Sequence, residues 1–599
     1  MYVILLILEK GGNCMSEYIL MLIFLPLVFA LTILFNSVRV RNIATYLFVA
    51  FLIGISLRVF FANTIIELNF NHIVHTVFII IDFILIGYFL LQGIKYKDKL
   101  IGIFAFLQLV LFMVFLQFSS TIISQDILVD KVSLVMLLVV NIIGGIIIIY
   151  SLQYIQSEEF KACKKNLFIS ILFFFLGVMN LVVTTNNIEI FFLAFELTTL
   201  CSYILIRFRN DELSVQNARR ALWMNQIGGV AILLSLLSGV YYYDTIYFDT
   251  LIKHINGLFL LPISLLILAA FVKGASIPFE KWLLGAMVAP TPVSAILHSA
   301  TMVKIAPYII LKIAPAFSTT LSLAVIFFGT FVFMMASLLA LGKDFFKEIL
   351  GLSTIALLAL MMAIASIGTP EAVNICLILI VFHAISKAML FLQAGVLEKE
   401  FHLKYLQDID YLMSRSKLLV FFIVIGFASL TLPPFGAFIG KFASIELVAS
   451  LIHKNVFYIF PLLFILIGSV FLTLLYFKVL TKLIASDDKK YEEVSISWTY
   501  KFTSFLLVAL LCFGIYISYI NDFMTHIEIA LATSLILFTF GLLYFATFKN
   551  IKKVSPYNCA EKDSVQLSAY YFVIADKYKE LISYIAIFLI VLIVYMGMI

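Results

Sequence analysis

The chain contains very few charged residues for its length. Of its 599 residues, 12% are Asp, Glu, Lys or Arg and 63% are hydrophobic, and the mean hydropathy is +1.13. An ordinary soluble domain carries about 25% charged residues. This composition excludes a soluble protein and predicts one polytopic integral membrane protein embedded in a lipid bilayer. The formal charge of +6 is too small and too dispersed for a nucleic-acid-binding protein.

Cysteine is also scarce, and its spacing is uninformative for metal binding. The six cysteines never approach CxxC spacing, so this chain has no ligand set for a [NiFe] centre, an iron-sulfur cluster or a structural zinc. We therefore predict no metal and no cofactor in this chain, and place any redox chemistry in partner subunits. A Walker A sequence is absent as well, which excludes direct coupling to ATP.

Long hydrophobic runs are abundant. Windows of about 20 apolar residues predict an all-α protein with about 16 to 18 transmembrane helices. The candidate spans are 18–37, 43–62, 73–92, 99–118, 131–153, 166–185, 189–207, 218–239, 257–274, 292–313, 320–341, 346–367, 372–395, 417–441, 457–481, 500–520, 526–547 and 579–599.

The loops between these spans alternate in basic content. One set carries the Lys and Arg residues, including those near 39–41, 95–97, 161–165, 343–347, 399–417, 489–490 and 549–553. The other set, exemplified by TNN at 185–187 and GTPEA at 368–372, is nearly free of them. Basic loops are cytoplasmic by the positive-inside rule. We therefore expect a prokaryotic cell-membrane protein with both termini on the extracytoplasmic side.

The first fourteen residues, MYVILLILEKGGNC, do not fit a signal peptide, because they lack a basic beginning and a clear cleavage site. Lys10, Gly11 and Gly12 can be encoded by a sequence that resembles a ribosome-binding site upstream of Met15. We expect translation to start at Met15 and treat 1–14 as a mis-annotated start or a leader.

Residues 266–310 place charged residues and helix breakers together inside an apolar segment. They carry Lys273, His298 and Lys304, interrupted by Gly274 and Pro278 and by further prolines at 290 and 292. A charge near the centre of a bilayer costs roughly 2.5–3.5 kcal/mol on insertion scales. Broken helix is tolerated there only where protein or a water-filled cavity receives the backbone. The segment therefore predicts movement of a charged species.

Glu196 lies near the middle of the 189–207 span among large apolar side chains, where burial disfavours its charged form. Lys273 ends the 257–274 span next to Gly274 and Pro278, where a broken helix exposes carbonyl groups. If the two side chains face each other, each favours the charged form of the other. Separating them would then act as a switch.

The second half of the chain repeats this design. Lys387 lies inside the 372–395 span, one helical turn after His383. Lys441 follows Pro433 and Pro434, as Lys273 borders Gly274 and Pro278. Two broken helices in corresponding positions indicate inverted repeats. We place two five-helix repeats at 166–313 and 320–481.

The sequence also resembles a known family. WLLGAMVAPTPVSAILHSATMVK at 282–304 is similar to a signature of the antiporter-like subunits of complex I, of Mrp-type antiporters and of group 4 membrane-bound [NiFe] hydrogenases. Further matching pieces occur in the family's order: IYSLQYI at 149–155, FELTTLCSY at 195–203, KEILGLSTI at 347–355, FHAISKAMLFLQAG at 382–395 and LPPFGAFIGKF at 432–442. The segment WLLGAM is most similar to the corresponding segment of Ech-type energy-converting hydrogenases. Leu379 departs from the pattern, because some members carry a second histidine there.

The resemblance implies a domain order and a set of proton-carrying residues. The order would be extra N-terminal helices at 15–120, a family N-terminal helix and loop at 121–165, the two repeats, and C-terminal helices at 482–599. Glu196 and Lys273 would form the first half-channel, and Lys304 and Lys387 would relay protons to Lys441. His298 and His383 would lie near the central axis, and Lys347 is a weaker candidate.

Alternative structural roles exist for these residues, since a buried Glu-Lys pair can join helices and a histidine can bind a carbonyl group. Uncompensated insertion of Glu196 with the four lysines at 273, 304, 387 and 441 would cost on the order of 15 kcal/mol. That cost favours a functional set. Lys347 is equally well explained as a helix cap, and for Arg58 and Asp82 in the N-terminal spans we expect a structural ion pair.

The expected function is proton translocation, without covalent chemistry in this chain, driven by a ferredoxin-linked [NiFe] hydrogenase. The partners would be other membrane subunits and a cytoplasmic module with [NiFe] and iron-sulfur subunits. The alternatives are a component of an Mrp-type Na+/H+ antiporter, a component of a complex I-like oxidoreductase, or an inactive membrane anchor. The sequence leaves open whether H+ or Na+ is moved, because carboxylates, carbonyls and water serve both ions.

Overall fold

Helices make up nearly all of the structure. The computed structural model describes residues 14–118, 120, 122, 124–255, 259–409, 412–432, 435–484, 494–520 and 574–598. Within these ranges, fifteen helices are long and apolar enough to cross a membrane, and two apolar helices, Lys99–Phe115 and Leu261–Lys273, are shorter. The predicted all-α polytopic fold is confirmed. The predicted start region up to residue 13 and the predicted span 526–547 lie outside the described residues.

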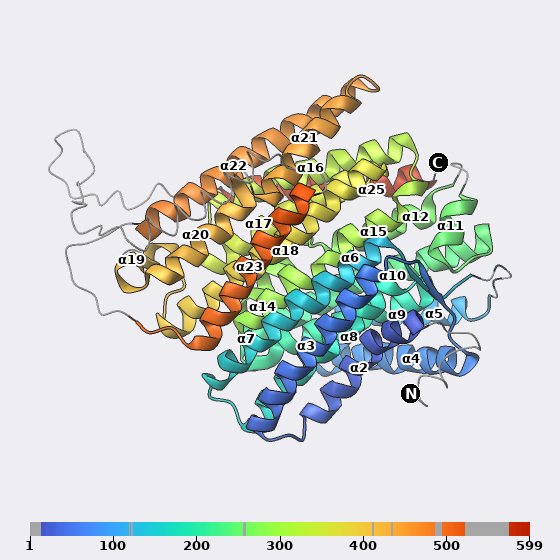
Figure 1. Cartoon of the computed structure of the whole chain (residues 1–599). Coiled ribbons are helices and arrows are strands. Elements are labelled where there is room, and N and C mark those ends of the chain that lie inside the picture. The colour runs from blue at the N-terminus through green and yellow to red at the C-terminus, as the bar shows by residue number, and fades with distance from the viewer. Residues whose placement is uncertain are drawn as a thin grey trace.

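The N-terminal third forms one side of the molecule, drawn in blue in Figure 1, with α2 and α3 at one edge. Contacts join α2 to α8 and α5 to α10, so this part packs directly on the helices that follow it. The elements are α2 (Cys14–Ile33), α3 (Val38–Ala62), β1 (Ile66–Leu68), α4 (His72–Lys95), α5 (Lys99–Phe115), β2 (Ile127–Val129), α6 (Lys131–Leu138), η1 (Val139–Ile143), α7 (Gly144–Gln156) and α8 (Ala162–Thr184).

A small antiparallel sheet was not expected from the sequence. β1 pairs with β2 in the register Ile66 with Val129 and Leu68 with Ile127. Both strands lie in connections between helices, and the inward-facing apolar side chains of each strand are buried. The pair ties two loops together at the end of the molecule whose loops lack basic residues.

The central third contains most of the interrupted helices. It comprises α9 (Ile188–Ile206), η2 (Arg207–Arg209), α10 (Glu212–Tyr243), α11 (Phe248–His254), α12 (Leu261–Lys273), α13 (Glu280–Gly285), η3 (Ala286–Val288), α14 (Thr291–Ala295), η4 (Ile296–Ala300), η5 (Met302–Lys304), α15 (Ile305–Ile313) and η6 (Ala314–Ala316).

Two breaks in this region have local causes. α12 ends at Lys273, and Gly274 and Pro278 lie in the connection that leads to α13. The predicted span 292–313 is not one helix, because η4 is a π-helix and Thr301 leaves helical geometry with φ −124° and ψ −108°. Pro292 begins α14, where its missing N–H costs no hydrogen bond. The prolines were visible in the sequence as helix breakers, but the break at Thr301 was not predicted.

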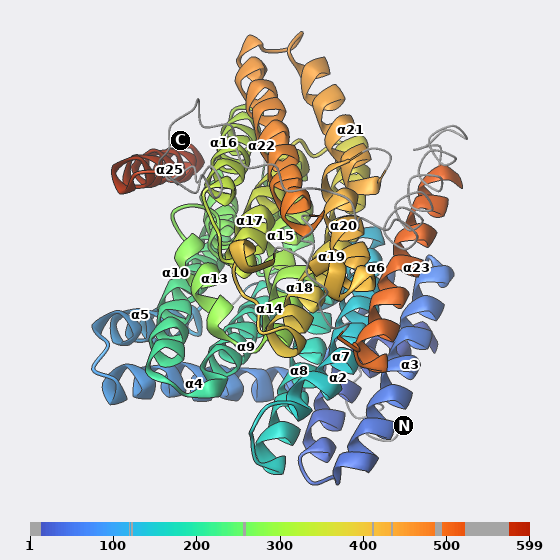
Figure 2. The same cartoon turned by 90° about the vertical axis from the view of Figure 1, so that its left-hand side faces the viewer.

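The last third carries the remaining membrane helices, and Figure 2 shows α21 and α22 projecting together beyond the rest of the bundle. Its elements are α16 (Thr319–Leu341), α17 (Phe346–Ala365), α18 (Pro370–Glu400), η7 (Leu406–Ile409), α19 (Leu412–Arg415), α20 (Lys417–Thr431), α21 (Gly436–Leu451), η8 (Val456–Tyr458), α22 (Ile459–Ile484), α23 (Trp498–Ile520) and α25 (Asp576–Met598).

The predicted span 417–441 corresponds to two helices. α20 ends at Thr431 and α21 begins at Gly436, so Lys441 lies in the second turn of a new helix. Pro433 and Pro434, predicted as the helix break, lie outside the described residues. The boundary between the predicted repeats falls between η6 and α16, and the repeats themselves stay a prediction.

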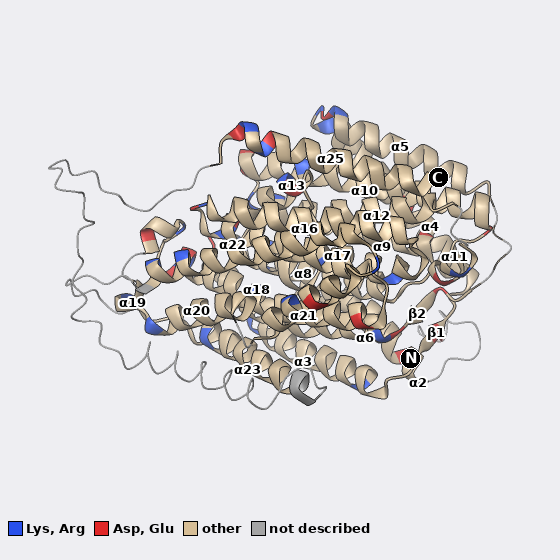
Figure 3. Cartoon of the chain, turned by 90° about the horizontal axis from the view of Figure 1, so that it is seen from above, with Lys and Arg blue, Asp and Glu red and all other residues tan. Residues whose placement is uncertain are grey.

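Burial separates an inner set of helices from an outer set. The spans that contain α17 and α18 are 94% and 89% buried, whereas those of α4, α22 and α25 are each 28% buried. Figure 3 shows tan residues along most of the helical length, with charged residues gathered mainly at helix ends. The few charges inside the inner helices therefore stand out as candidates for function.

Candidate functional site

Glu196 is fully buried in the middle of α9. Its Oε1 accepts a hydrogen bond from the Gln108 side-chain Nε2 at 2.8 Å, and its Oε2 has no hydrogen-bond partner among the described residues. Gly229 on α10 makes room for this contact, because a Cβ atom there would lie 3.0 Å from Glu196 Cδ and still closer to Oε1. A carboxyl group held on one oxygen and free on the other is arranged to take up and release a proton.

Lys273 reaches α9 on either side of Glu196 without forming a direct ion pair with it. Its Nζ donates to the Phe195 carbonyl at 3.1 Å and to Thr199 Oγ1 at 3.0 Å, and it lies 3.8 Å from the centroid of the Phe195 ring. The two charges are nevertheless close enough to interact. The structure therefore brings the predicted acid and lysine together, with the Thr199 hydroxyl beside both.

The end of α12 is closed by protein groups. The indole of Trp282 donates to the Val272 carbonyl at 2.9 Å, and the backbone N–H of Ser276 donates to the Phe271 carbonyl at 3.0 Å. These bonds satisfy carbonyl groups that the helix end would otherwise leave unpaired. They fix the position of the C-terminal end of α12, where Lys273 lies.

Lys304 and His383 form the most direct contact between two predicted site residues. Lys304 Nζ and His383 Nδ1 are hydrogen-bonded at 2.7 Å, and His383 Nε2 has no partner. Both residues are fully buried. A lysine and an imidazole at this distance can exchange one proton, because each accepts it in its neutral form.

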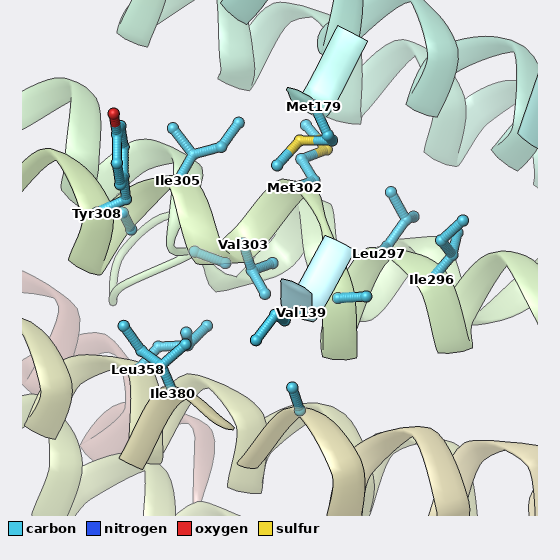
Figure 4. Packing of buried hydrophobic residues seen from close by; sticks show 14 of the residues in the cluster. Val139, Met179, Ile296, Leu297, Met302, Val303, Ile305, Tyr308, Leu358 and Ile380 are labelled. Carbon is cyan, nitrogen blue, oxygen red and sulfur yellow. The ribbon is translucent and has the colours of Figure 1, made fainter. Parts of the chain in front are cut away.

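The protein around Lys304 is apolar. Figure 4 shows Met302 and Val303, which precede it, packed among Val139 of η1, Met179 of α8 and Leu358 of α17. Such surroundings stabilise a charge only through its few polar contacts. The position of the proton therefore depends strongly on neighbouring charges.

Lys387 lies one turn after His383 on α18. It donates to the Leu350 carbonyl at 3.0 Å and to Ser353 Oγ at 2.5 Å, both on α17. His298 lies against the Phe391 ring at 4.7 Å between centroids, with both ring nitrogens unpartnered. His298 is close enough to interact with Lys387, and His383 with both lysines. The four side chains at 298, 304, 383 and 387 therefore form one central cluster.

Lys441 lies apart from this cluster. It is 3% exposed and has no hydrogen-bond acceptor among the described residues. It lines a cavity of about 350 Å³ between α21 and α22, together with Thr431, Ser469, Thr473 and several apolar side chains. Glu446, further along α21, is exposed, and among the described residues it forms no ion pair with Lys441.

Lys347 belongs to a charged network at the end with the basic loops. Its Nζ is 2.6 Å from Glu398 Oε2, and the same oxygen accepts from Thr291 at 2.7 Å. Arg209 lies 3.7 Å from Glu398 and 3.1 Å from Glu158, which also binds Lys399 at 2.9 Å. Lys347 therefore does more than cap a helix, and it is not part of the central cluster.

Glu158, in the loop after α7, is the member of this network that lies outside the membrane spans. Burial by itself raises the pKa of its carboxyl group. The hydrogen bond from Lys399 and the charges of Arg209 and Lys399 together have a larger, opposite effect, so that the pKa lies below its usual value. Glu158 is therefore ionised at neutral pH, and its ion pairs link the loop after α7 with η2 and α18.

The expected ion pair between Arg58 and Asp82 is wrong. Arg58 is exposed and lies 5.1 Å from the Tyr18 ring centroid. Asp82 is 1% exposed, and within the part of the chain that the structure describes neither of its carboxyl oxygens has a hydrogen-bond partner. The two residues lie on different helices, and apolar periodicity does not fix which faces meet.

Sequence reasoning missed several polar groups of the site. Glu398 lies eleven residues after Lys387, which is three helical turns, so a shared face was readable from the sequence. Thr199 is similarly one turn after Glu196. Gln108 gave no signal, because it comes from α5 and meets Glu196 across 88 residues of sequence. Among the described residues, no group of three His, Cys, Asp or Glu side chains is placed to hold a metal ion.

Two known families match the chain over the part that holds this site. Residues 185–471 match the membrane family described as NADH:quinone oxidoreductase/Mrp antiporter, and residues 115–162 match the N-terminal family of complex I chain 5. The matched segments include every predicted site residue and both broken regions.

Two curated relatives are components of Na+/H+ antiporters. One from Staphylococcus haemolyticus is 30% identical over 375 residues, which cover 58% of this chain and 46% of the relative. Another from Alkalihalophilus pseudofirmus is 31% identical over 342 residues, which cover 53% of this chain and 42% of the relative. The chain thus spans about half the length of the curated relatives that it matches.

Two solved structures share the fold. A chain of the Mrp complex from a Dietzia species superposes with a TM-score of 0.66 at 15% identity, covering 89% of this chain and 98% of that one. A chain of the membrane-bound sulfane sulfur reductase, an archaeal respiratory membrane complex, gives 0.60 at 19% identity, covering 78% and 99%. Because residues 115–162 and 185–471 match these family models, this chain belongs to the superfamily of antiporter-like membrane subunits that complex I and Mrp antiporters share.

Proposed function

We propose that this chain translocates protons as one component of a multi-subunit cation/proton antiporter of the Mrp type. The observation that carries the proposal is the central cluster, in which Lys304 contacts His383 at 2.7 Å and Lys387 follows one turn later. A buried base passes its proton on rapidly only where another base lies within hydrogen-bonding distance. A purely structural cluster would need counter-charges, and none pairs with these residues among those described.

The Glu196 end supplies a control point for this movement. Lys273 is bound to the Phe195 carbonyl and the Thr199 hydroxyl, both neutral groups, and interacts with the Glu196 charge from a short distance. A small shift of α12 relative to α9 would change that interaction strongly in a medium of low dielectric constant. The proton affinity of Lys273 would change with it and alter the charge felt by Lys304.

Lys441 supplies the other end. Its ammonium group lies beside a cavity that borders α22, an outer helix, and has no acceptor among the described residues. A proton arriving at Lys441 therefore has a short path out of the inner helices. The predicted order of movement is Lys273, Lys304 with His383, Lys387 and then Lys441.

The Mrp assignment is supported by the relatives. The curated proteins described above are named Na+/H+ antiporter subunits, and the Dietzia complex is an Mrp complex. A redox-driven complex remains the second candidate, because the WLLGAM wording is similar to that of Ech-type hydrogenases and the sulfane sulfur reductase chain is covered over 99% of its length. Ferredoxin and a [NiFe] module would then be the partners, in place of other antiporter subunits.

The function is tested by exchange in inside-out membrane vesicles that contain the chain with its native partners. A fluorescent pH dye reports the collapse of a preformed proton gradient when Na+ is added. We expect exchange in the wild type and a loss of at least about ten-fold in Lys304→Met. Unchanged exchange in that variant would remove the central cluster from the mechanism.

A matched control lies on the same stretch of chain. Lys312, on α15, is paired with Asp130 at 2.8 Å and contacts none of the central cluster. Lys312→Gln keeps a hydrogen-bond donor for Asp130 and should exchange ions at the wild-type rate. Purification of the tagged complex decides between the two candidates. Nickel and iron-sulfur subunits with H2 evolution from reduced ferredoxin would indicate the hydrogenase, and antiporter subunits alone would indicate the Mrp type.

A further inference from the structure

The hairpin of α4 and α5 contributes polar side chains to the Glu196 site. Both helices come before residue 116, and the matched family segments begin at 115 and 185. α5 packs along α10, and α4 packs against α9. Gln108 of α5 donates both to Glu196 Oε1 at 2.8 Å and to the Gln226 carbonyl at 3.3 Å.

Asp82 is the acidic residue within α4. Its side chain is buried, both oxygens lack hydrogen-bond partners, and the charges of Glu189 and Glu196 are close enough to act on it. Glu189 and Glu196 are seven residues apart on α9, which places them on one face about 10.5 Å apart along the helix. Asp82 is therefore a buried acid on α4, the helix of the hairpin that packs against the α9 helix carrying both carboxyl groups.

Gln108 gives an independent indication of a transported ligand. Its amide nitrogen is fixed on Glu196, while its amide oxygen is fully buried and accepts no hydrogen bond from the protein. The second oxygen of Glu196 is equally free. Among the described residues, each of these two side chains therefore keeps one buried acceptor oxygen without a donor, and a protonated carrier such as hydronium could supply a donor.

The far end of this row of acids reaches the surface. Glu189 is close to His75 and Asp126. His75 Nε2 lies 2.9 Å from Asp126 Oδ2, and the His75 side chain is 28% exposed. This end contains β1 and β2 and belongs to the side whose loops lack basic residues. His75 is therefore in contact with both solvent and the acidic residues of this end.

We propose that Glu189, Asp82 and Glu196 form an acidic file that carries protons between the His75–Asp126 pair and Lys273, which precedes the central cluster in the proposed order of movement. Gln108 is a positioning residue that fixes the Glu196 carboxylate within the file. The inference rests on the proposed function, because it supplies the access route for that proton movement.

Each step transfers one proton and changes no covalent bond between heavy atoms. A protonated carboxyl group donates through water to the neighbouring carboxylate, which becomes the next donor. Among the described residues, few charged groups face the file: His75 and Asp126 beside Glu189, Glu189 and Glu196 beside Asp82, and Lys273 beside Glu196. Like charges this close oppose simultaneous ionisation, so the file retains a proton to pass on.

The decisive variants are Asp82→Asn and Gln108→Leu, measured in the native complex in inside-out vesicles. We expect Asp82→Asn to slow proton exchange at least about ten-fold and Asp82→Glu to restore it. Gln108→Leu should slow exchange and displace its pH dependence, which a purely structural role would not do. The matched controls are Glu67→Gln, an exposed acid in β1, and Gln92→Leu, a buried glutamine that binds Tyr203 of α9. Both should behave as wild type.

Infrared difference spectroscopy of the same complex gives a readout that does not depend on transport. In the wild type, titration should reveal carbonyl bands of buried protonated carboxyl groups, and Asp82→Asn should remove one band and shift the Glu196 band. Identical spectra would overturn the file even if the wild type showed no exchange. Wild-type exchange in Asp82→Asn, with Glu196→Gln inactive, would overturn the file and leave the proposed function standing. Absence of exchange in the wild type would instead refute the proposed function.

Discussion

At the scale of single residues, the site is built from lysines that bind neutral acceptors. Lys273 binds a carbonyl group and a hydroxyl group, and Lys387 does the same on α17. Neutral acceptors stabilise an ammonium group less than a carboxylate does, yet they remain acceptable neighbours when the lysine is neutral. These lysines can therefore lose a proton without leaving a buried, unpaired anion behind.

The central contact predicts a specific loss in one variant. In His383→Phe the ring remains but Lys304 loses the nitrogen that it contacts, so proton movement from Lys304 to Lys387 should fall at least about ten-fold. Dye-detected exchange in vesicles measures it. His402→Phe, an exposed histidine in the loop after α18, is the control, and equal rates in both variants would contradict the relay.

Glu158 predicts how stability depends on pH. Its pKa in the folded protein is lower than in the unfolded chain, so its contribution is fully present above the unfolded pKa of about 4.3 and is lost as pH falls through the folded pKa. Glu158→Gln should therefore destabilise by about 1 kcal/mol at pH 7 and by less at pH 4. Thermal unfolding of the detergent-solubilised complex at the two pH values measures this. A penalty that grew on acidification would contradict the assigned direction.

At the scale of helices, close approach between α9 and α10 creates the Glu196 site. Gly229 allows it, since any side chain there would overlap the Glu196 carboxyl group and the Gln108 amide. Helix breaks after Lys273 and at Thr301 also determine where nearby side chains lie, because the chain leaves helical geometry there inside apolar surroundings. Position along a helix and distance between helices together determine which charges meet.

Gly229→Ala tests this packing. The added methyl group should destabilise the protein by about 1–3 kcal/mol and displace the Glu196 carboxyl group, which lowers exchange. Unfolding temperature and vesicle exchange are measured together. Gly102→Ala on α5 is the control, because a Cβ there meets nothing within 4 Å and should leave both quantities unchanged or raise stability slightly.

At the scale of the whole molecule, basic loops mark one side and the acidic file opens on the other. The network of Lys347, Glu398, Arg209 and Glu158 lies at the basic end, while His75 and Asp126 lie at the opposite end. If the basic loops are cytoplasmic, the file faces outward. The direction of access then follows from the topology of the whole chain.

Cys163 allows that orientation to be measured. It is an exposed free cysteine at the start of α8, beside the basic loop. A membrane-impermeant maleimide should modify it in inside-out vesicles and not in right-side-out cells, in a variant whose Cys14, Cys512 and Cys559 are replaced. Labelling in whole cells would invert the predicted topology.

The sequence predicted the helices well because hydrocarbon imposes a strong length requirement on each span. It also identified Glu196 and the buried lysines, since any charge in an apolar run is conspicuous. It did not predict the Gln108 contact or the isolation of Asp82 from Arg58, because apolar runs carry no information on which helices touch. The break at Thr301 was hidden for a different reason, as it involves neither proline nor glycine.

The π-helices η1 and η4 have a consequence for how this chain tolerates change. Each turn of a π-helix accommodates one residue more than an α-helical turn, because its hydrogen bonds run from i to i+5. Removing that residue would let the wide turn close to an α-helical turn, whereas removing a residue from a regular α-helical turn would rotate everything beyond it by about 100°. Deletion of one residue from α18 before His383 would therefore turn His383 away from Lys304 while leaving composition and hydropathy almost untouched. In such a protein the number of residues between two positions of a helix is constrained as much as the identity of those residues.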